Sequence, residues 1–176
     1  MSVSVRDARA SAEDRRWLEG VYRDYLDDLS PLNTGIFPAL GEVGHSGPDQ
    51  LTRWFADSSA VPLVIVQATT PVGFAMVARG GSHVQPSIRF RMAEFFITRP
   101  HRRLGIGERA VQLILDRFAG SWEIVEYLRN PAAVSFWRRV VSRYTRGQYQ
   151  ERVQNGEVRQ TLESGSTRAG QGPAPG

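Results

Sequence analysis

Two arginines, two glycines and the start of a predicted helix follow one another at residues 102–108, directly after an apolar run that ends at Ile97. Glycines allow backbone N–H groups to face a ligand without obstruction by a Cβ atom. A helix N-terminus adds the positive end of a dipole, and Arg102 and Arg103 add full positive charges. These features together suit a phosphate or pyrophosphate group, although ordinary surface loops also contain Gly-x-Gly beside arginine.

A second candidate for chemistry is Glu94, the single carboxylate in the strand predicted over residues 88–97. Side chains alternate along a strand with period two, so one face is expected to carry Ile88, Phe90, Met92, Glu94 and Phe96. A carboxylate in apolar surroundings has a raised pKa and makes a competent general base near neutral pH. The alternative is a structural ion pair with Arg89, Arg91 or a neighbouring strand. We favour the general base.

Composition narrows the class of protein. The 176 residues fit one domain with a sizeable core. Cysteine is absent and all 22 basic residues are arginine, which excludes thiol and lysine nucleophiles and thiolate metal sites. The net charge of +4 is modest because 18 acidic residues are interspersed with the arginines, so nucleic-acid binding is not expected. Apolar runs are too short to span a membrane and no signal peptide is visible, so a cytoplasmic protein without a membrane partner is expected.

The elements that must position these residues follow from apolar spacing and turn residues. Helices are predicted from Ser11 to Ser30, over residues 49–55 and 108–118, and from the N-cap Asn130 onward. Strands are predicted over residues 3–8, 61–68, 72–78, 88–97 and 122–128. A long loop is expected over residues 31–48, where four glycines and three prolines lie.

The C-terminal end carries Asn155-Gly156 between two strand-like runs, which predicts a β-hairpin. From Glu163 the chain contains mainly small and polar residues, so we predict a folded domain over residues 1–162 and a disordered tail over residues 163–176. The element order implies an α/β fold, a mixed sheet with helices on both faces.

Two motifs resemble those of the GCN5-related N-acetyltransferase (GNAT) superfamily. Residues 102–107 match its acyl-CoA signature, Q/R-x-x-G-x-G/A, between a strand and a helix. Residues 130–137 resemble its second motif, Asn-x-x-Ala followed by an aromatic pair. The resemblance implies a mostly antiparallel sheet of about seven strands, and acetyl-CoA as cosubstrate without a metal. In the order of helices and strands, the resemblance extends over roughly residues 3–162.

The resemblance also implies residue roles. The backbone of the strand end would pair with the pantetheine arm, amides of the turn would hold the pyrophosphate, and the second motif would contact the pantetheine. The residues concerned are Phe96, Ile97, Thr98, Arg102, Arg103, Leu104, Gly105, Ile106, Gly107, Glu108, Asn130, Ala133, Phe136 and Trp137. Structural roles remain open for several of them, such as an N-cap at Asn130 or core packing at Ile97.

Family members transfer an acetyl group directly from acetyl-CoA to an amine, here predicted to be a primary amine of a small molecule rather than of a protein or peptide. Glu94 would accept the amine proton, directly or through water. A backbone N–H near Phe96 or Ile97 would stabilise the oxyanion. Asp24, Asp27 and Asp28 are weak candidates for attracting a cationic amine.

One position departs from the family pattern. Many members protonate the leaving thiolate with a tyrosine seven residues after the motif asparagine, where this chain has Trp137. Water, Tyr127 or Tyr144 could replace it; Tyr144 is the weak general-acid candidate. The alternative function is a non-catalytic acyl-CoA-binding module. Because members of the family often form homodimers, a homodimer is possible here.

Overall fold

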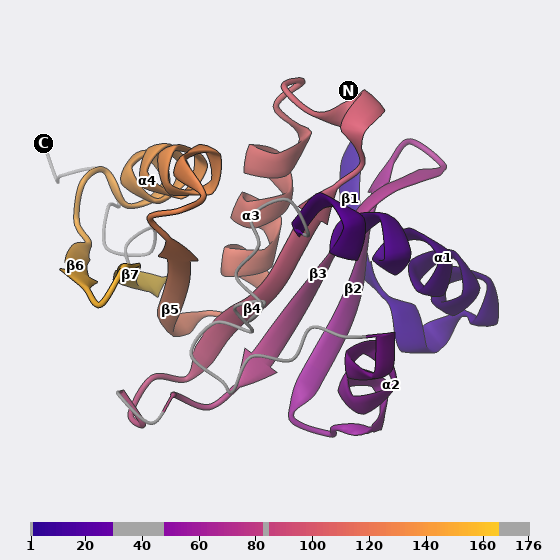
Figure 1. Cartoon of the computed structure of the whole chain (residues 1–176), viewed down its shortest axis with the longest axis horizontal. Coiled ribbons are helices and arrows are strands. Elements are labelled where there is room, and N and C mark those ends of the chain that lie inside the picture. Colours follow the sequence, from indigo (N-terminus) through magenta and orange to yellow (C-terminus); the bar gives the residue numbers. More distant parts are fainter. Residues whose placement is uncertain (1, 30–47, 83–84, 166–176) are drawn as a thin grey trace, which may run out of the picture.

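A mixed seven-stranded sheet forms the centre of the protein, in the strand order β1-β2-β3-β4-β5-β7-β6 (Figure 1). The computed structural model describes residues 2–29, 48–82 and 85–165. The strands are β1 (Val3–Asp7), β2 (Ala60–Gln67), β3 (Thr70–Arg79), β4 (Phe90–Ile97), β5 (Gly120–Tyr127), β6 (Gln150–Gln154) and β7 (Glu157–Ser164). Within these described ranges, the β4–β5 pair is parallel and the other pairs are antiparallel. The predicted α/β fold class is confirmed.

Helices cover both faces of the sheet. The helices are α1 (Ala12–Leu29), α2 (Pro48–Ala56), α3 (Ile106–Arg117) and α4 (Pro131–Thr145), with short 3₁₀ turns η1 (Ala8–Ala10) and η3 (Arg99–His101). One apolar cluster joins the sheet to α1 and α2, and another joins it to α3 and α4. Because each helix presents one apolar stripe, burying it against the sheet yields three layers. None of the helices in the described ranges combines the length and apolarity needed to cross a membrane.

The alternation of side chains along β4 breaks at Ala93. In the register with β3, Glu94 pairs with Met76, whereas Met92 pairs with the next residue, Val77. Ala93 is therefore the extra residue of a β-bulge. A one-residue shift reverses which face every later side chain points to.

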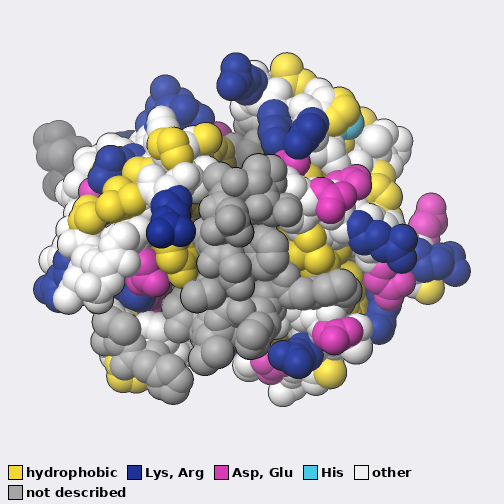
Figure 2. All heavy atoms as spheres, viewed as in Figure 1, with side chains coloured by type: hydrophobic (Ala, Val, Ile, Leu, Met, Phe, Trp, Pro, Cys, Tyr) yellow, Lys and Arg dark blue, Asp and Glu magenta, His cyan; other side chains and the backbone are white. Residues whose placement is uncertain are grey.

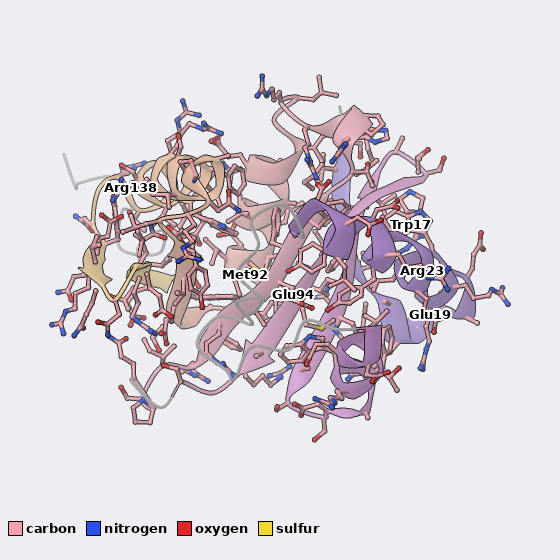
Figure 3. The ribbon with its side chains drawn as sticks, viewed as in Figure 1. Trp17, Glu19, Arg23, Met92, Glu94 and Arg138 are labelled. Carbon is pink, nitrogen blue, oxygen red and sulfur yellow. The ribbon has the colours of Figure 1, made fainter. Side chains whose placement is uncertain are left out.

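The predicted common face of this strand is consequently wrong. Phe90 and Met92 pack in the cluster beneath α3 and α4. Phe96 packs in the cluster beneath α1 and α2, and Glu94 accepts a hydrogen bond from the hydroxyl of Tyr22 on α1 at 2.8 Å. The bulge therefore turns Glu94 toward α1 (Figure 3, where Met92 and Glu94 are labelled).

The parallel strands β4 and β5 pair over only two residues, Phe90 with Trp122 and Arg91 with Glu123. Beyond these pairs the strands separate toward their carboxyl ends, as Figure 1 shows. In open sheets with parallel strands, ligands bind where neighbouring strands diverge in this way. The fold thus positions a candidate site at the ends of β4 and β5.

The C-terminal hairpin forms as predicted, with positive φ at both Asn155 (54°) and Gly156 (77°). Strand β7, however, runs to Ser164, two residues past the predicted end of the domain. The Ser164 hydroxyl accepts hydrogen bonds from the Trp122 indole N–H at 3.1 Å and the Gly120 N–H at 3.2 Å, which fixes this end. Residues 166–176 of the predicted tail and residues 31–47 of the loop predicted over residues 31–48 lie outside the described residues, and Pro48 begins α2.

Candidate functional site

A groove of about 940 Å³ opens between the carboxyl ends of β4 and β5. Its walls come from the end of β4, the turn before α3, the first turn of α3, one side of α4 and the end of α1. The lining residues are Tyr25, Asp28, Phe95, Phe96, Ile97, Arg102, Arg103, Gly105, Gly107, Glu108, Asn130, Ala132, Ala133, Ser135, Phe136, Trp137, Arg139 and Arg143.

The β4 wall presents main-chain groups to this groove. The Thr98 N–H donates to the Val72 carbonyl at 2.9 Å, so Thr98 faces β3. Because main-chain groups alternate sides along an antiparallel pair, those of Phe96 also face β3, and those of Phe95 and Ile97 face the groove. The main chains of Phe96 and Thr98, which are predicted to pair with pantetheine, therefore face β3 rather than the groove.

The turn from β4 to α3 presents a row of main-chain donors. The first bond of α3 runs from the Arg109 N–H to the Gly105 carbonyl at 3.1 Å, so the N–H groups of residues 106–108 have no partner within the helix. Arg103 (φ 62°) and Gly105 (φ 79°) adopt left-handed conformations that shape the turn. In the described part of the chain, no acceptor bonds any N–H from residue 103 to 108.

Gly107 allows α3 and α4 to meet at the groove floor. A Cβ atom on Gly107 would lie 3.2 Å from the Phe136 ring and 3.6 Å from Ile97 Cγ1. The glycine therefore has a packing role in addition to exposing its N–H. Phe136 in turn stacks on Phe95, with ring centroids 5.8 Å apart, and contacts Trp137 edge-on at 5.1 Å.

The arginines of the turn have different roles. Figure 2 shows arginine side chains gathered over this turn. The Arg102 guanidinium donates to the Ile97 carbonyl at 2.7 Å and to Asp28 of α1, and Arg99 also donates to Asp28 at 2.6 Å. Arg103 is exposed at the rim. Arg102 thus joins α1 to the turn, whereas Arg103 lines the groove.

Asp28 is a partner of arginines rather than a binding group for a cationic amine. Burial alone would raise its pKa, but the hydrogen bonds from Arg102 and Arg99 outweigh burial and hold the pKa of Asp28 below its usual range. Asp24 and Asp27 are exposed on α1. At the opposite wall Arg143 donates to Glu108 at 2.9 Å, so this groove cation is also paired.

The start of α4 forms the second wall. Asn130 is the N-cap, and its side chain accepts from the Ala133 N–H at 3.1 Å, as the sequence predicts. The Ala133 N–H is therefore used inside the protein, whereas both side chains line the groove. Arg139 lies over the Phe136 ring at 5.8 Å and adds a positive charge to this wall.

Glu94 lies behind the groove wall rather than in it. Its side chain is 2% exposed and is not among the groove-lining residues. On the α1 side it contacts Tyr22, and its charge acts on Tyr25, which does line the groove. A carboxylate thus sits one side chain away from the open space.

A family model for the GNAT acetyltransferases, described as "Acetyltransferase (GNAT) family", matches residues 18–141. The chain belongs to the GNAT acetyltransferase family. By family it is an acyltransferase, as the sequence resemblance predicts. Comparison with curated protein sequences gave no match.

Solved acetyltransferases share the fold of this GNAT protein at low identity. An acetyltransferase from Thermus thermophilus is 13% identical with a TM-score of 0.66, covering 93% of this chain and 97% of that one. AAC(6′)-Ib in complex with ribostamycin and coenzyme A is 12% identical with a TM-score of 0.64, covering 99% and 100%. The yncA protein of Salmonella typhimurium with its cofactor acetyl-CoA is 13% identical with a TM-score of 0.58, covering 100% and 99%.

Several residues predicted to act in this GNAT site lie elsewhere. Tyr144 donates from its hydroxyl to Asp116 at 2.7 Å and is not a groove residue. Tyr127 is also outside the lining, and burial raises its pKa to about 12. Leu104 is 51% exposed, and Ile106 is fully buried, so their side chains do not form the groove and only their N–H groups remain candidates.

Sequence reasoning missed Tyr25, Phe95, Arg139 and Arg143 as groove residues. The sequence predicts Tyr25 only as part of the apolar stripe of α1 and predicts no functional role for Phe95. Arg139 and Arg143 are four residues apart on α4, a spacing that places both on one face of a helix. That spacing is the feature of the sequence that indicates a shared location for the two arginines. In the described ranges, no group of three or more acidic or histidine side chains could hold a metal ion.

Proposed function

We propose that this chain transfers the acetyl group of acetyl-CoA directly to a primary amine of a small molecule. The observation that carries the proposal is the row of main-chain N–H groups from residue 103 to 108, without acceptors in the described chain, at one end of the groove. Such a row at a helix N-terminus is a ready site for a phosphate or diphosphate.

The residues present fit acetyl-CoA. The groove of about 940 Å³ is within the size range of cofactor sites. The diphosphate would meet the N–H row and the guanidinium of Arg103. The pantetheine arm would run along the groove-facing main-chain groups of Phe95 and the N–H of Ile97, because the Ile97 carbonyl already accepts from Arg102. When bound, acetyl-CoA supplies an activated thioester.

The chain's own residues would then accept the amine proton and stabilise the negative charge that develops on the carbonyl oxygen. Glu94 is proposed as the general base that takes the amine proton. The N–H groups of Phe95 and Ile97 face the groove and are suited to stabilise an oxyanion. An alkyl thiol has a pKa of about 8.5, so its thiolate leaves without a strong acid. The indole at Trp137 is therefore compatible with transfer.

The class of amine is proposed by comparison with a ligand of a protein that shares this fold. The structure of AAC(6′)-Ib, which shares this fold, contains ribostamycin, an amine-bearing small molecule, together with coenzyme A. An acceptor would enter from the α1 side of the groove, where Tyr25 forms the wall. Exposed Asp24 and Asp27 on the same helix would favour a cationic acceptor.

The test has two steps. Saturating acetyl-CoA should raise the melting temperature, because a ligand that binds only the folded state stabilises it. Release of free thiol is then measured with spermidine, ribostamycin, tyramine and a lysine-containing peptide. Glu94→Gln should abolish turnover while the stabilisation by acetyl-CoA is kept. No stabilisation, or no thiol release with any amine, would refute the proposal; stabilisation without turnover would indicate an acyl-CoA-binding module instead.

A further inference from the structure

A base at Glu94 needs a route for the proton. The carboxylate is 2% exposed and lies behind the groove wall. One of its oxygens, Oε1, accepts the Tyr22 hydroxyl at 2.8 Å. An amine in the groove therefore has a side chain between itself and this carboxylate.

Tyr25 is the side chain in that position. It lies three residues after Tyr22, on the same face of α1, and it lines the groove while being 8% exposed. Its ring is fixed by edge-on contacts with Phe74, at 5.2 Å, and with Phe96, at 5.6 Å. Burial, then the charge of Glu94, raise the pKa of Tyr25 well above its usual value, and a hydrogen bond to Glu94 contributes as well. The hydroxyl is therefore kept protonated. The Tyr25 ring lies beside the Tyr22 ring, with centroids 5.3 Å apart, and the Tyr22 hydroxyl contacts Glu94.

We propose that Tyr25 relays the proton of the acceptor amine to Glu94. As the amine nitrogen attacks the thioester carbonyl, its N–H bond breaks and the proton passes to the Tyr25 oxygen. The O–H bond of Tyr25 breaks in the same step, and its proton passes to the Glu94 carboxylate. Tyr25 stays neutral throughout, Glu94 ends as the carboxylic acid, and the electron pair of the broken thioester bond leaves with the coenzyme A sulfur.

This relay rests on the proposed function, and it assigns a catalytic residue to α1 that no motif of the sequence predicts. It also accounts for a base that is not itself in the groove. Tyr22 touches the same carboxylate but is not among the groove-lining residues. The two tyrosines therefore form a natural pair of test and control positions.

The experiment compares Tyr25→Phe with Tyr22→Phe in the full chain, using the amine among spermidine, ribostamycin and tyramine that the wild type turns over fastest. Phenylalanine keeps each ring and removes only the hydroxyl. Tyr25→Phe should lower kcat by roughly a hundredfold, with stabilisation by acetyl-CoA unchanged. Tyr22→Phe should lower kcat by less than about tenfold, because it removes one hydrogen bond to Glu94 but not the route.

The dependence of kcat on the fraction of D₂O in the solvent distinguishes a proton relay from a structural role. A residue with a purely structural role would leave the shape of that dependence unchanged. The wild type and Tyr22→Phe should show a curved dependence, since two protons move together, and Tyr25→Phe should show a linear or absent one. Site-specific 3-fluorotyrosine at position 25 keeps the fold and lowers the phenol pKa, so it should change both kcat and the isotope effect.

Equal losses at the two positions, or a curved dependence in Tyr25→Phe, would overturn the relay, as would an unchanged rate with 3-fluorotyrosine. In those cases the wild type still transfers acetyl groups and the proposed function stands. A wild type without activity refutes the proposed function itself, and the relay with it.

Discussion

Replacing Glu126 with glutamine is expected to stabilise the protein at alkaline pH and to leave its stability at acid pH unchanged. Glu126 lies on β5 and is 4% exposed, and neither of its carboxylate oxygens has a hydrogen-bond partner among the described residues. The Gln160 amide donates to Glu151 at 3.1 Å, and Arg138 donates to Glu151 at 2.9 Å. Burial therefore raises the pKa of Glu126 to about 8, with Gln160 and Arg138 offsetting only part of the effect.

The size of the effect follows from linkage. The unfolded chain has the ordinary value of 4.5 at this residue, so the folded protein binds more protons than the unfolded one between pH 4.5 and about 8. Stability from this group is fully present below pH 4.5 and is lost as the pH rises through about 8. At 1.36 kcal/mol per pKa unit, the loss is on the order of 5 kcal/mol. Glutamine imitates the protonated acid and avoids this loss.

Thermal melting at pH 5, 7 and 9 measures the difference. At pH 9 Glu126→Gln should melt on the order of 10 °C above the wild type, since 1 kcal/mol shifts a domain of this size by about 2–4 °C. At pH 5 the two should melt together. Glu163→Gln removes an exposed carboxylate at the end of β7 and serves as the matched control. Parallel pH profiles for wild type and Glu126→Gln, or a less stable variant at pH 9, would refute the reasoning.

Three further predictions concern the turn and the domain boundary. Gly105→Ala should lower the free energy of unfolding, measured in urea, by about 1 kcal/mol, because φ at this position is +79°. No atom lies within 4 Å of the new Cβ, so the cost is in the backbone conformation. The same change should weaken coenzyme A binding measured by calorimetry; unchanged affinity would argue against an ordered N–H row. Asp28→Asn should lower stability by about 1 kcal/mol by removing the partner of Arg102; since the pKa of Asp28 is lowered, the difference should be full above pH 3.8 and vanish as the pH falls below that value. Ser164→Ala should cost about 1 kcal/mol through the lost bond to Trp122, and a chain ending at residue 162 should melt below one ending at residue 165; equal melting would support the shorter boundary.

The sequence by itself determined the features that depend on a few neighbouring residues. Asn130 caps α4 because a side-chain oxygen reaches an N–H three residues on. Asn155 and Gly156 form the hairpin turn because both tolerate positive φ. The order of helices and strands followed from apolar spacing, and the family was predictable from the two motifs. Each of these is a local property of the chain.

Only the tertiary structure decided which side chains reach the groove. The bulge at Ala93 depends on the register with β3, and it turns Glu94 toward α1, against the alternation expected from the strand alone. Strand β7 continues to Ser164 because β5 lies beside it, which composition does not encode. Tyr25 rather than Tyr144 reaches the groove because α1 packs across the end of β4. Such contacts join residues distant in sequence, so the spacing of neighbouring residues carries no signal for them.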